Sequence, residues 1–189
     1  GMTAQPERRG AGASWSSPTV FEAAGKAQVA VLSLPWVSVY SAKDGAELWK
    51  ADCLNGEITP SPIFAGGLLV VPSPSEKLTA FRPDGSGDVT KTHVAWENED
   101  SIPDVSTPAS NGELLFMLTT SGFLNAVGMK DGKKVWEHDY EIEFHSSPAI
   151  AGNHVYLFSQ KGTTVVFEAA REYKELLRTE LPDSFHASP

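Results

Sequence analysis

The chain of 189 residues is poor in cysteine, in basic residues and in long apolar runs, and each shortage excludes something. Its single cysteine, Cys53, cannot form an intrachain disulfide or a metal cluster built on cysteine. Cys53 closely follows the tryptophan of a predicted strand, so we interpret it as a small packed side chain and not as a nucleophile. Cysteine content alone leaves the cellular compartment open.

Basic residues are outnumbered, with 15 Lys and Arg against 24 Asp and Glu, for a formal net charge of −9. Nucleic acids and anionic membranes attract proteins through lysine- and arginine-rich faces, so neither is expected as a partner. No run of eighteen apolar residues occurs, which argues against direct insertion into a membrane. The polar opening GMTAQPERRG predicts a flexible tail over residues 1–13.

Proline is plentiful, and part of it recurs at a regular spacing. Five prolines, each directly preceded by Ser or Thr or a Ser-rich stretch, are separated by 44, 46, 40 and 41 residues: Pro18, Pro62, Pro108, Pro148 and Pro189. A period in this range is typical of repeat architectures. The spacing therefore predicts repeats of about forty residues.

Other features recur in step with these prolines. Each copy continues with a glycine turn, an apolar run, a second run that alternates, and a segment that holds Trp49, Trp96 or Trp136, with Leu177 at this place in the last copy. Asp44-Gly45 and Asp131-Gly132 precede the tryptophan segments and suit tight hairpins. Each copy thus reads as four short strands, and such units pack face to face around an axis in a β-propeller.

The predicted fold is an all-β propeller of four-stranded antiparallel blades, with about four blades in this chain. A helical pattern over 168–177 competes with the last predicted outer strand, and we follow the repeat there. The long connection after Phe81 is expected to protrude from the surface. The approximate blades are 14–55, 56–101, 102–141 and 142–183, with the start of a fifth at 184–189.

The order of Ser-x-Pro, glycine, apolar strand and YSAKDGAELW, which ends at Trp49, resembles the repeat of the PQQ-like β-propellers over residues 14 to 189. The sequence departs from the family's tryptophan-docking motif where Ser41, Arg82 and Gly128 replace its Asp, and where Asp44 and Asp131 replace its Thr. The resemblance implies a periplasmic or other extracytoplasmic location. It also implies rings of seven or eight blades.

Three tryptophans recur at one position per repeat. Trp49, Trp96 and Trp136 could be mistaken for a sugar-stacking set, but their recurrence favours packing between blades. We therefore interpret them as structural residues that dock one blade on the next.

The residues three places before the repeat prolines are candidates to face the central channel or its rim. Trp15, His145 and His186 hold this position, together with Thr59 and Val105, and Asp104 and Glu57 lie near the same rim. These side chains could meet a ligand. The alternative is that each histidine bonds backbone at a blade junction, and two histidines without a third ligand are a weak indication of a metal.

The resemblance also raises the question of cofactors. The family's enzyme branch binds pyrroloquinoline quinone and calcium, and a disulfide between adjacent cysteines covers the quinone. Cys53 has no neighbouring cysteine, so we expect neither group to bind.

The function predicted is a non-catalytic binding or scaffold module. Two alternatives stay open: a quinone- and calcium-dependent dehydrogenase, or part of one, and an extracytoplasmic sensor domain. Four blades leave propeller edges open, so the chain is expected to be part of a longer protein or to close by self-association, with two halves forming one eight-bladed ring as the simplest symmetric arrangement. A protein partner is a further expectation.

Overall fold

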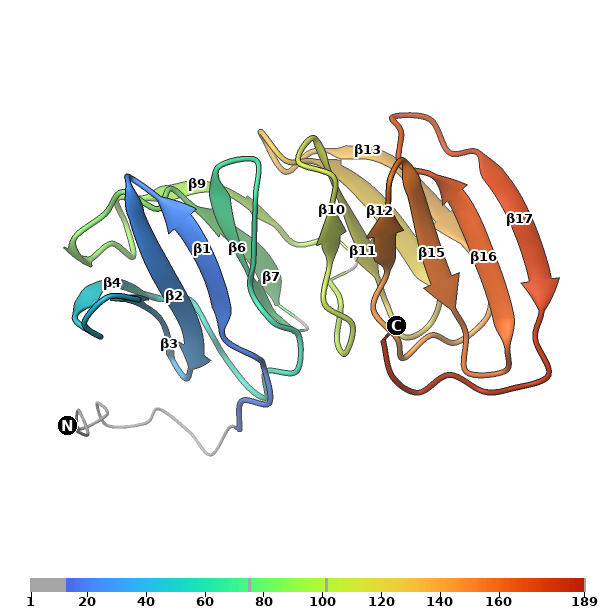
Figure 1. The fold of residues 1–189 in the computed structure, drawn as a ribbon, viewed down its shortest axis with the longest axis horizontal. Coiled ribbons are helices and arrows are strands. Elements are labelled where there is room, and N and C mark those ends of the chain that lie inside the picture. The colour runs from blue at the N-terminus through green and yellow to red at the C-terminus, as the bar shows by residue number, and fades with distance from the viewer. Residues whose placement is uncertain (1–12, 75, 101, 189) are drawn as a thin grey trace.

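The computed structural model describes residues 13–74, 76–100 and 102–188 of the chain, so residues 1–12 of the predicted tail lie outside it. These residues form four antiparallel four-stranded units and no helix. Figure 1 shows the four sheets side by side in chain order, with the first and last at opposite ends and no closed ring. The predicted all-β propeller of four blades is confirmed as a partial propeller.

Each blade consists of strands that follow one another in sequence and in space. The first blade contains β1 (Thr19–Ala23), β2 (Lys26–Ser33), β3 (Trp36–Ser41) and β4 (Glu47–Asp52). The second contains β5 (Ile63–Ala65), β6 (Leu68–Ser73), β7 (Lys77–Phe81) and β9 (Val94–Asn98). The third contains β10 (Ala109–Ser110), β11 (Leu114–Leu118), β12 (Phe123–Gly128) and β13 (Lys134–Asp139). The fourth contains β14 (Ala149–Ala151), β15 (His154–Phe158), β16 (Thr163–Glu168) and β17 (Glu175–Glu180).

Apolar side chains fill the three spaces between adjacent blades. Successive residues of a strand point to opposite faces, so a strand between two neighbours supplies both of its junctions. On β11, for example, Phe116 belongs to the core shared with the fourth blade, whereas Leu115 and Met117 belong to the core shared with the second. The apolar runs of the two middle blades, in β6 and β11, are therefore strands buried on both faces, whereas β2 and β15 of the end blades are fully buried only at alternate residues.

The two acid-glycine pairs form hairpin turns, as predicted. Gly45 and Gly132 have positive φ angles of 74° and 65°, which glycine adopts without strain. The Oδ1 atoms of Asp44 and Asp131 each accept the backbone N–H two residues on, both at 3.2 Å. The acid thus closes the turn while the glycine supplies its backbone conformation.

The last copy follows the repeat and not the helical pattern. β17 (Glu175–Glu180) pairs with β16, and Leu177 lies opposite Val166 just as Trp136 lies opposite Ala126 in the third blade. Both pairs lie beside a register shift at the equivalent point. Backbone pairing with β16 in the register of the repeat overrides the local helical periodicity, although no residue of β17 is fully buried.

The expectation of a protruding connection after Phe81 is wrong for its central part. The connection returns to the first blade, where β8 (Gly87–Asp88) pairs in parallel with β4 as a fifth strand of that sheet. Val89 is only 1% exposed in the first interblade core, and its N–H donates to the Lys50 carbonyl at 2.8 Å. Burial of Val89 keeps the central part of this connection packed against the first blade, so this part does not protrude from the surface.

Candidate functional site

A chain of hydrogen bonds links the starts of successive blades. In each step a backbone N–H donates to the hydroxyl that precedes the next repeat proline, and all four distances are 2.9 Å. The participating residues are Ser17, Ser61, Thr107, Ser147 and Ser188. We call this series the hydroxyl ladder. Its residues are separated by 44, 46, 40 and 41 positions, so it connects equivalent points of every copy.

The tryptophans contact the blade that follows their own. Trp96 Nε1 donates to the Met129 carbonyl at 2.8 Å, and a Cβ added to Gly132 would lie 2.5 Å from the indole. Trp136 Nε1 donates to the Ala170 carbonyl at 2.9 Å in the same way. Trp49 is fully buried beside Phe81 of the second blade, with 6.0 Å between the ring centroids. These contacts support the proposed docking role, which the mutations described in the Discussion test.

One end of the molecule carries all the connections between blades, and we call it the connection face. It lies at the lower end of Figure 1, where the chain enters the first strand and leaves the fourth strand of each blade. The second-to-third-strand turns share this end because the strands alternate in direction. The connection face therefore displays two kinds of loop from every blade.

The candidate rim residues lie on this face but do not form one site. Trp15 is 62% exposed, and Glu57, Asp104 and His186 are also exposed, whereas His145 is half-buried. Within residues 13–188, leaving out 75 and 101, no three His, Cys, Asp or Glu side chains are grouped closely enough to hold a metal ion. The rim role of these residues stays a prediction.

Asp104 has a defined partner among them. Its Oδ1 accepts the Thr120 hydroxyl at 2.7 Å and the Thr120 backbone N–H at 3.0 Å. Burial, the largest single influence, raises the pKa of this carboxyl, but the hydrogen bonds from Thr120 and from nearby backbone outweigh it. The net effect lowers the pKa of Asp104 below its ordinary value of 3.8.

This lowered pKa predicts a pH-dependent contribution to stability. A carboxyl with a lower pKa in the folded state stabilises the fold above the unfolded pKa, and the contribution disappears as the pH falls through the folded pKa. We expect Asp104→Asn to lower the free energy of unfolding near neutral pH, with the difference shrinking as the pH falls below about 3.8. Urea unfolding of the parent and of Asp104→Asn, from neutral pH to below about 3.8, measures this difference in the free energy of unfolding. A difference that does not change with pH would contradict the assignment.

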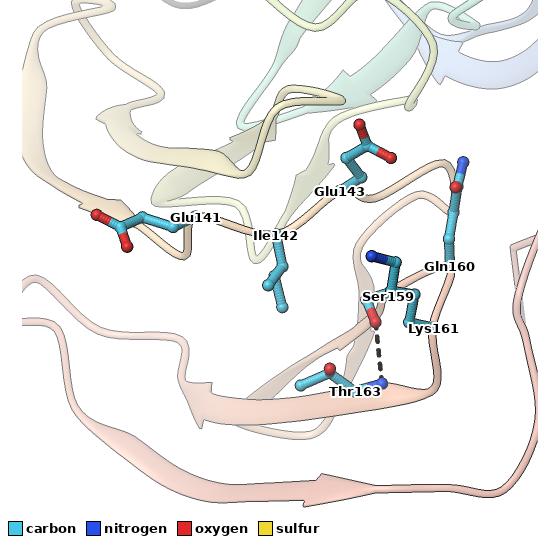
Figure 2. Close-up of a pocket in the computed structure, with 7 residues that line it drawn as sticks. All are labelled: Glu141, Ile142, Glu143, Ser159, Gln160, Lys161 and Thr163. Atoms are coloured by element: carbon cyan, nitrogen blue, oxygen red, sulfur yellow. Dashed lines mark hydrogen bonds between the residues drawn. The ribbon is translucent and has the colours of Figure 1, made fainter.

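A pocket of about 290 Å³ lies on the connection face between the third and fourth blades. Its lining comes from the connection after β13 and the turn before β16: Glu141, Ile142, Glu143, Ser159, Gln160, Lys161 and Thr163. Figure 2 shows the two carboxylates diverging on either side of Ile142, whose side chain points towards Thr163. The Ser159 hydroxyl accepts the Thr163 N–H at 2.9 Å, so this hydroxyl stabilises the turn before β16.

A second pocket of about 310 Å³ occupies the equivalent place between the first and second blades. It is lined by Cys53 and Asn55 of the connection, Pro35 of the first blade, and Glu76 and Lys77 of the second. Desolvation raises the pKa of the Cys53 thiol to about 12, so the thiol stays protonated at neutral pH. The two pockets occupy equivalent places because the repeat recurs, and in the first of them the Thr163 hydroxyl donates to Glu180 Oε2 at 3.1 Å.

Exposed charge on the connection face is mainly negative. Its exposed acids include Glu57, Glu76, Glu99, Asp100, Asp104, Asp139, Glu141, Glu143 and Asp183. The lysines described at this end are Lys77, which pairs with Glu97 at 2.6 Å, and Lys161. At the opposite end the hairpins mix both signs, as in the ion pairs of Glu113 with Arg171 and of Glu168 with Lys174. The net charge of −9 is thus unevenly distributed.

Comparison with known families agrees with the repeat geometry. The family model described as outer membrane protein assembly factor BamB matches residues 7–189. The chain belongs to this BamB-like family of PQQ-like propellers. A search of curated proteins finds no match.

Solved structures with the same architecture as this BamB-like chain show the fold alone, because sequence identity is low. BamB from Moraxella catarrhalis superposes with a TM-score of 0.64 at 14% identity, covering 89% of this chain and 52% of that one. The computationally designed Ika8 protein gives a TM-score of 0.69 at 13% identity, covering 89% and 51%. The chain therefore spans about half the length of both structures.

The hydroxyl ladder is not among the features predicted from the sequence, although the sequence carries its signal. A Ser or Thr directly before the repeat proline occurs in every copy of this BamB-like chain. The spacing of the prolines predicts the repeat, but the sequence alone assigns no hydrogen-bond partner to the hydroxyl beside each proline. The ladder shows that the hydroxyl joins blades.

Among the described residues no helix is long and apolar enough to cross a membrane.

Proposed function

We propose that this chain is a non-catalytic scaffold module that binds a protein partner through its connection face. The observation that carries the proposal is that four of the seven exposed large apolar side chains among the described residues lie on this face, which also carries the acids. They are Trp15 at 62% exposure, Phe123 at 42%, Leu181 at 39% and Val105 at 37%. Apolar side chains exposed on one face, next to polar ones, are typical of protein interaction sites.

The geometry suits recognition more than chemistry. Loops held by a rigid β framework present side chains in fixed positions, as binding surfaces commonly do. Apolar side chains would be buried on binding, and the surrounding carboxylates would select a basic partner by electrostatic complementarity. The partner proposed is therefore a protein segment that combines lysine or arginine with apolar residues.

The family supports the same reading. Its description names an assembly factor for outer membrane proteins, which is a role in protein assembly. We propose by analogy a bacterial, extracytoplasmic setting for this chain. A scaffold of this kind also needs its two end blades covered, so self-association belongs to the proposal.

Peptide binding tests the proposed surface. We expect a labelled peptide of alternating lysine and leucine to bind, as measured by fluorescence anisotropy, and to weaken as salt is added. Trp15→Ala and Glu143→Lys should each weaken binding, whereas Glu113→Lys at the opposite end is the matched control and should not. Equal binding of a glutamate and leucine peptide, or no loss in Trp15→Ala, would overturn the proposal. Titration with pyrroloquinoline quinone and calcium checks the dehydrogenase alternative, which saturable uptake would favour.

A further inference from the structure

The first blade has one sheet face that no other blade covers. On β1, Phe21 points into the molecule and stacks on Phe64 of the second blade, with ring centroids 4.6 Å apart. Val20, the residue before it, points to the other side and is 70% exposed. Val20 pairs with Val29, and Val29 pairs with Tyr40, so the apolar stripe extends across three strands.

The last blade has the complementary face uncovered. Leu177 takes the register position that Trp136 takes in the third blade, and it is 51% exposed. Leu177 pairs with Val166 and Val166 with Tyr156, so a second apolar stripe crosses this sheet, in which Leu177 is exposed, Tyr156 is half-buried and Val166 is only 9% exposed. In the third blade the two residues equivalent to Val166 and Tyr156, Ala126 and Phe116, are completely buried by the fourth blade.

The three internal junctions show what such faces pack against. Each junction joins the face that carries the tryptophan position of one blade to the opposite face of the next blade. The last blade therefore offers the first half of a junction, and the first blade offers the second half. The hydroxyl ladder has the same polarity, since each blade donates its N–H to the next one along.

We infer that a second copy of this chain covers both faces. Its first blade packs on the last blade here, and its last blade packs on the first blade here, so one two-fold axis closes the ring. This inference does not depend on what the connection face binds.

The C-terminal segment 182–188 holds part of the place that the second copy would take. Ser188 already accepts the Ser147 N–H, and in a closed ring Ser17 of the second copy would compete for this bond. The segment is exposed except at Phe185, which is half-buried against Phe158 with ring centroids 5.2 Å apart. Ring closure thus displaces this segment, and its contacts oppose association.

Light scattering over a dilution series tests the inference on the intact chain. We expect a species of twice the chain mass of 20.3 kDa that dissociates on dilution. Val20→Asp and Leu177→Asp should each raise the dissociation constant about 30-fold or more, because each buries a charge in the junction. Phe185→Ala should lower the dissociation constant, because it weakens the contacts that hold segment 182–188 in the place of the second copy. Phe123→Asp is the matched control, since Phe123 is 42% exposed but lies on the connection face.

Several results of these experiments would overturn the inference, and misfolding of a variant can be told apart from them. Val20 and Leu177 are exposed in the single chain, so their aspartate variants should fold, which circular dichroism verifies. A single-chain mass at every concentration for both the parent and Phe185→Ala would overturn the inference. So would a dimer that the two aspartate variants leave intact, or a mass that keeps growing with concentration. A single chain that still bound the lysine and leucine peptide would refute ring closure alone.

Discussion

Trp96→Ala is expected to lower the free energy of unfolding by about 3 to 5 kcal/mol, the usual effect of truncating a buried large aromatic side chain. Trp96 is only 7% exposed, donates to the Met129 carbonyl and packs on Gly132. Removing the indole leaves a cavity between the second and third blades and an unpaired carbonyl group. For a chain of this size the melting temperature should fall by roughly 6 to 20 °C. Thermal unfolding followed by circular dichroism measures it.

Trp15→Ala is the matched control for this prediction. Trp15 is 62% exposed, so its removal should change the free energy of unfolding by no more than about 0.5 kcal/mol. Trp136→Ala should behave like Trp96→Ala, since it makes the equivalent contact one blade later. A variant of Trp96 or Trp136 that melts like the parent would show that the recurring tryptophans do not hold the blades together.

Gly122→Ala is expected to destabilise the fold by about 2 to 5 kcal/mol, from backbone strain and overpacking combined. Gly122 has a φ of 101°, and a Cβ there would lie 2.4 Å from the carbonyl oxygen of Ile142. Ile142 belongs to the connection that leads to the fourth blade, so the substitution pushes that connection away from the turn. Urea unfolding measures the change.

Gly112→Ala separates the two causes. Gly112 has a similar φ of 91°, but a Cβ there meets nothing within 4 Å. It should therefore show the cost of the backbone conformation alone, about 1 to 3 kcal/mol. Equal losses in the two variants would mean that the connection does not press on the turn at Gly122.

The fold could be predicted from sequence because its signals repeat. The prolines, glycine turns and tryptophans recur in register, so the copies support one another even where one is irregular. Leu177 shows this, because its helical surroundings mislead when read alone and its place in the repeat gives the correct strand. The repeat did not reveal features that occur once. Val89 is buried against the first blade, and no feature of the other copies predicts this burial.

The candidate site was harder to predict than the fold. Sequence position indicated that Trp15, His145 and Asp104 lie near one rim, but not how their side chains point or which partner each has. Asp104 bonds to Thr120, a residue of a different loop, which no local pattern connects. The gathering of acids and exposed apolar groups on one end follows from strand direction, which places loops distant in sequence side by side.

A double-mutant cycle between Trp136 and Tyr173 tests most directly the central claim that successive blades are docked through recurring tryptophans. The two rings belong to the third and fourth blades and lie 5.3 Å apart, edge to face. The single and double alanine variants should show a coupling energy of about 0.5 to 1.5 kcal/mol in urea unfolding. The distant pair of Trp49 and Tyr173 should show none. Losses that simply add for Trp136 and Tyr173 would contradict the account.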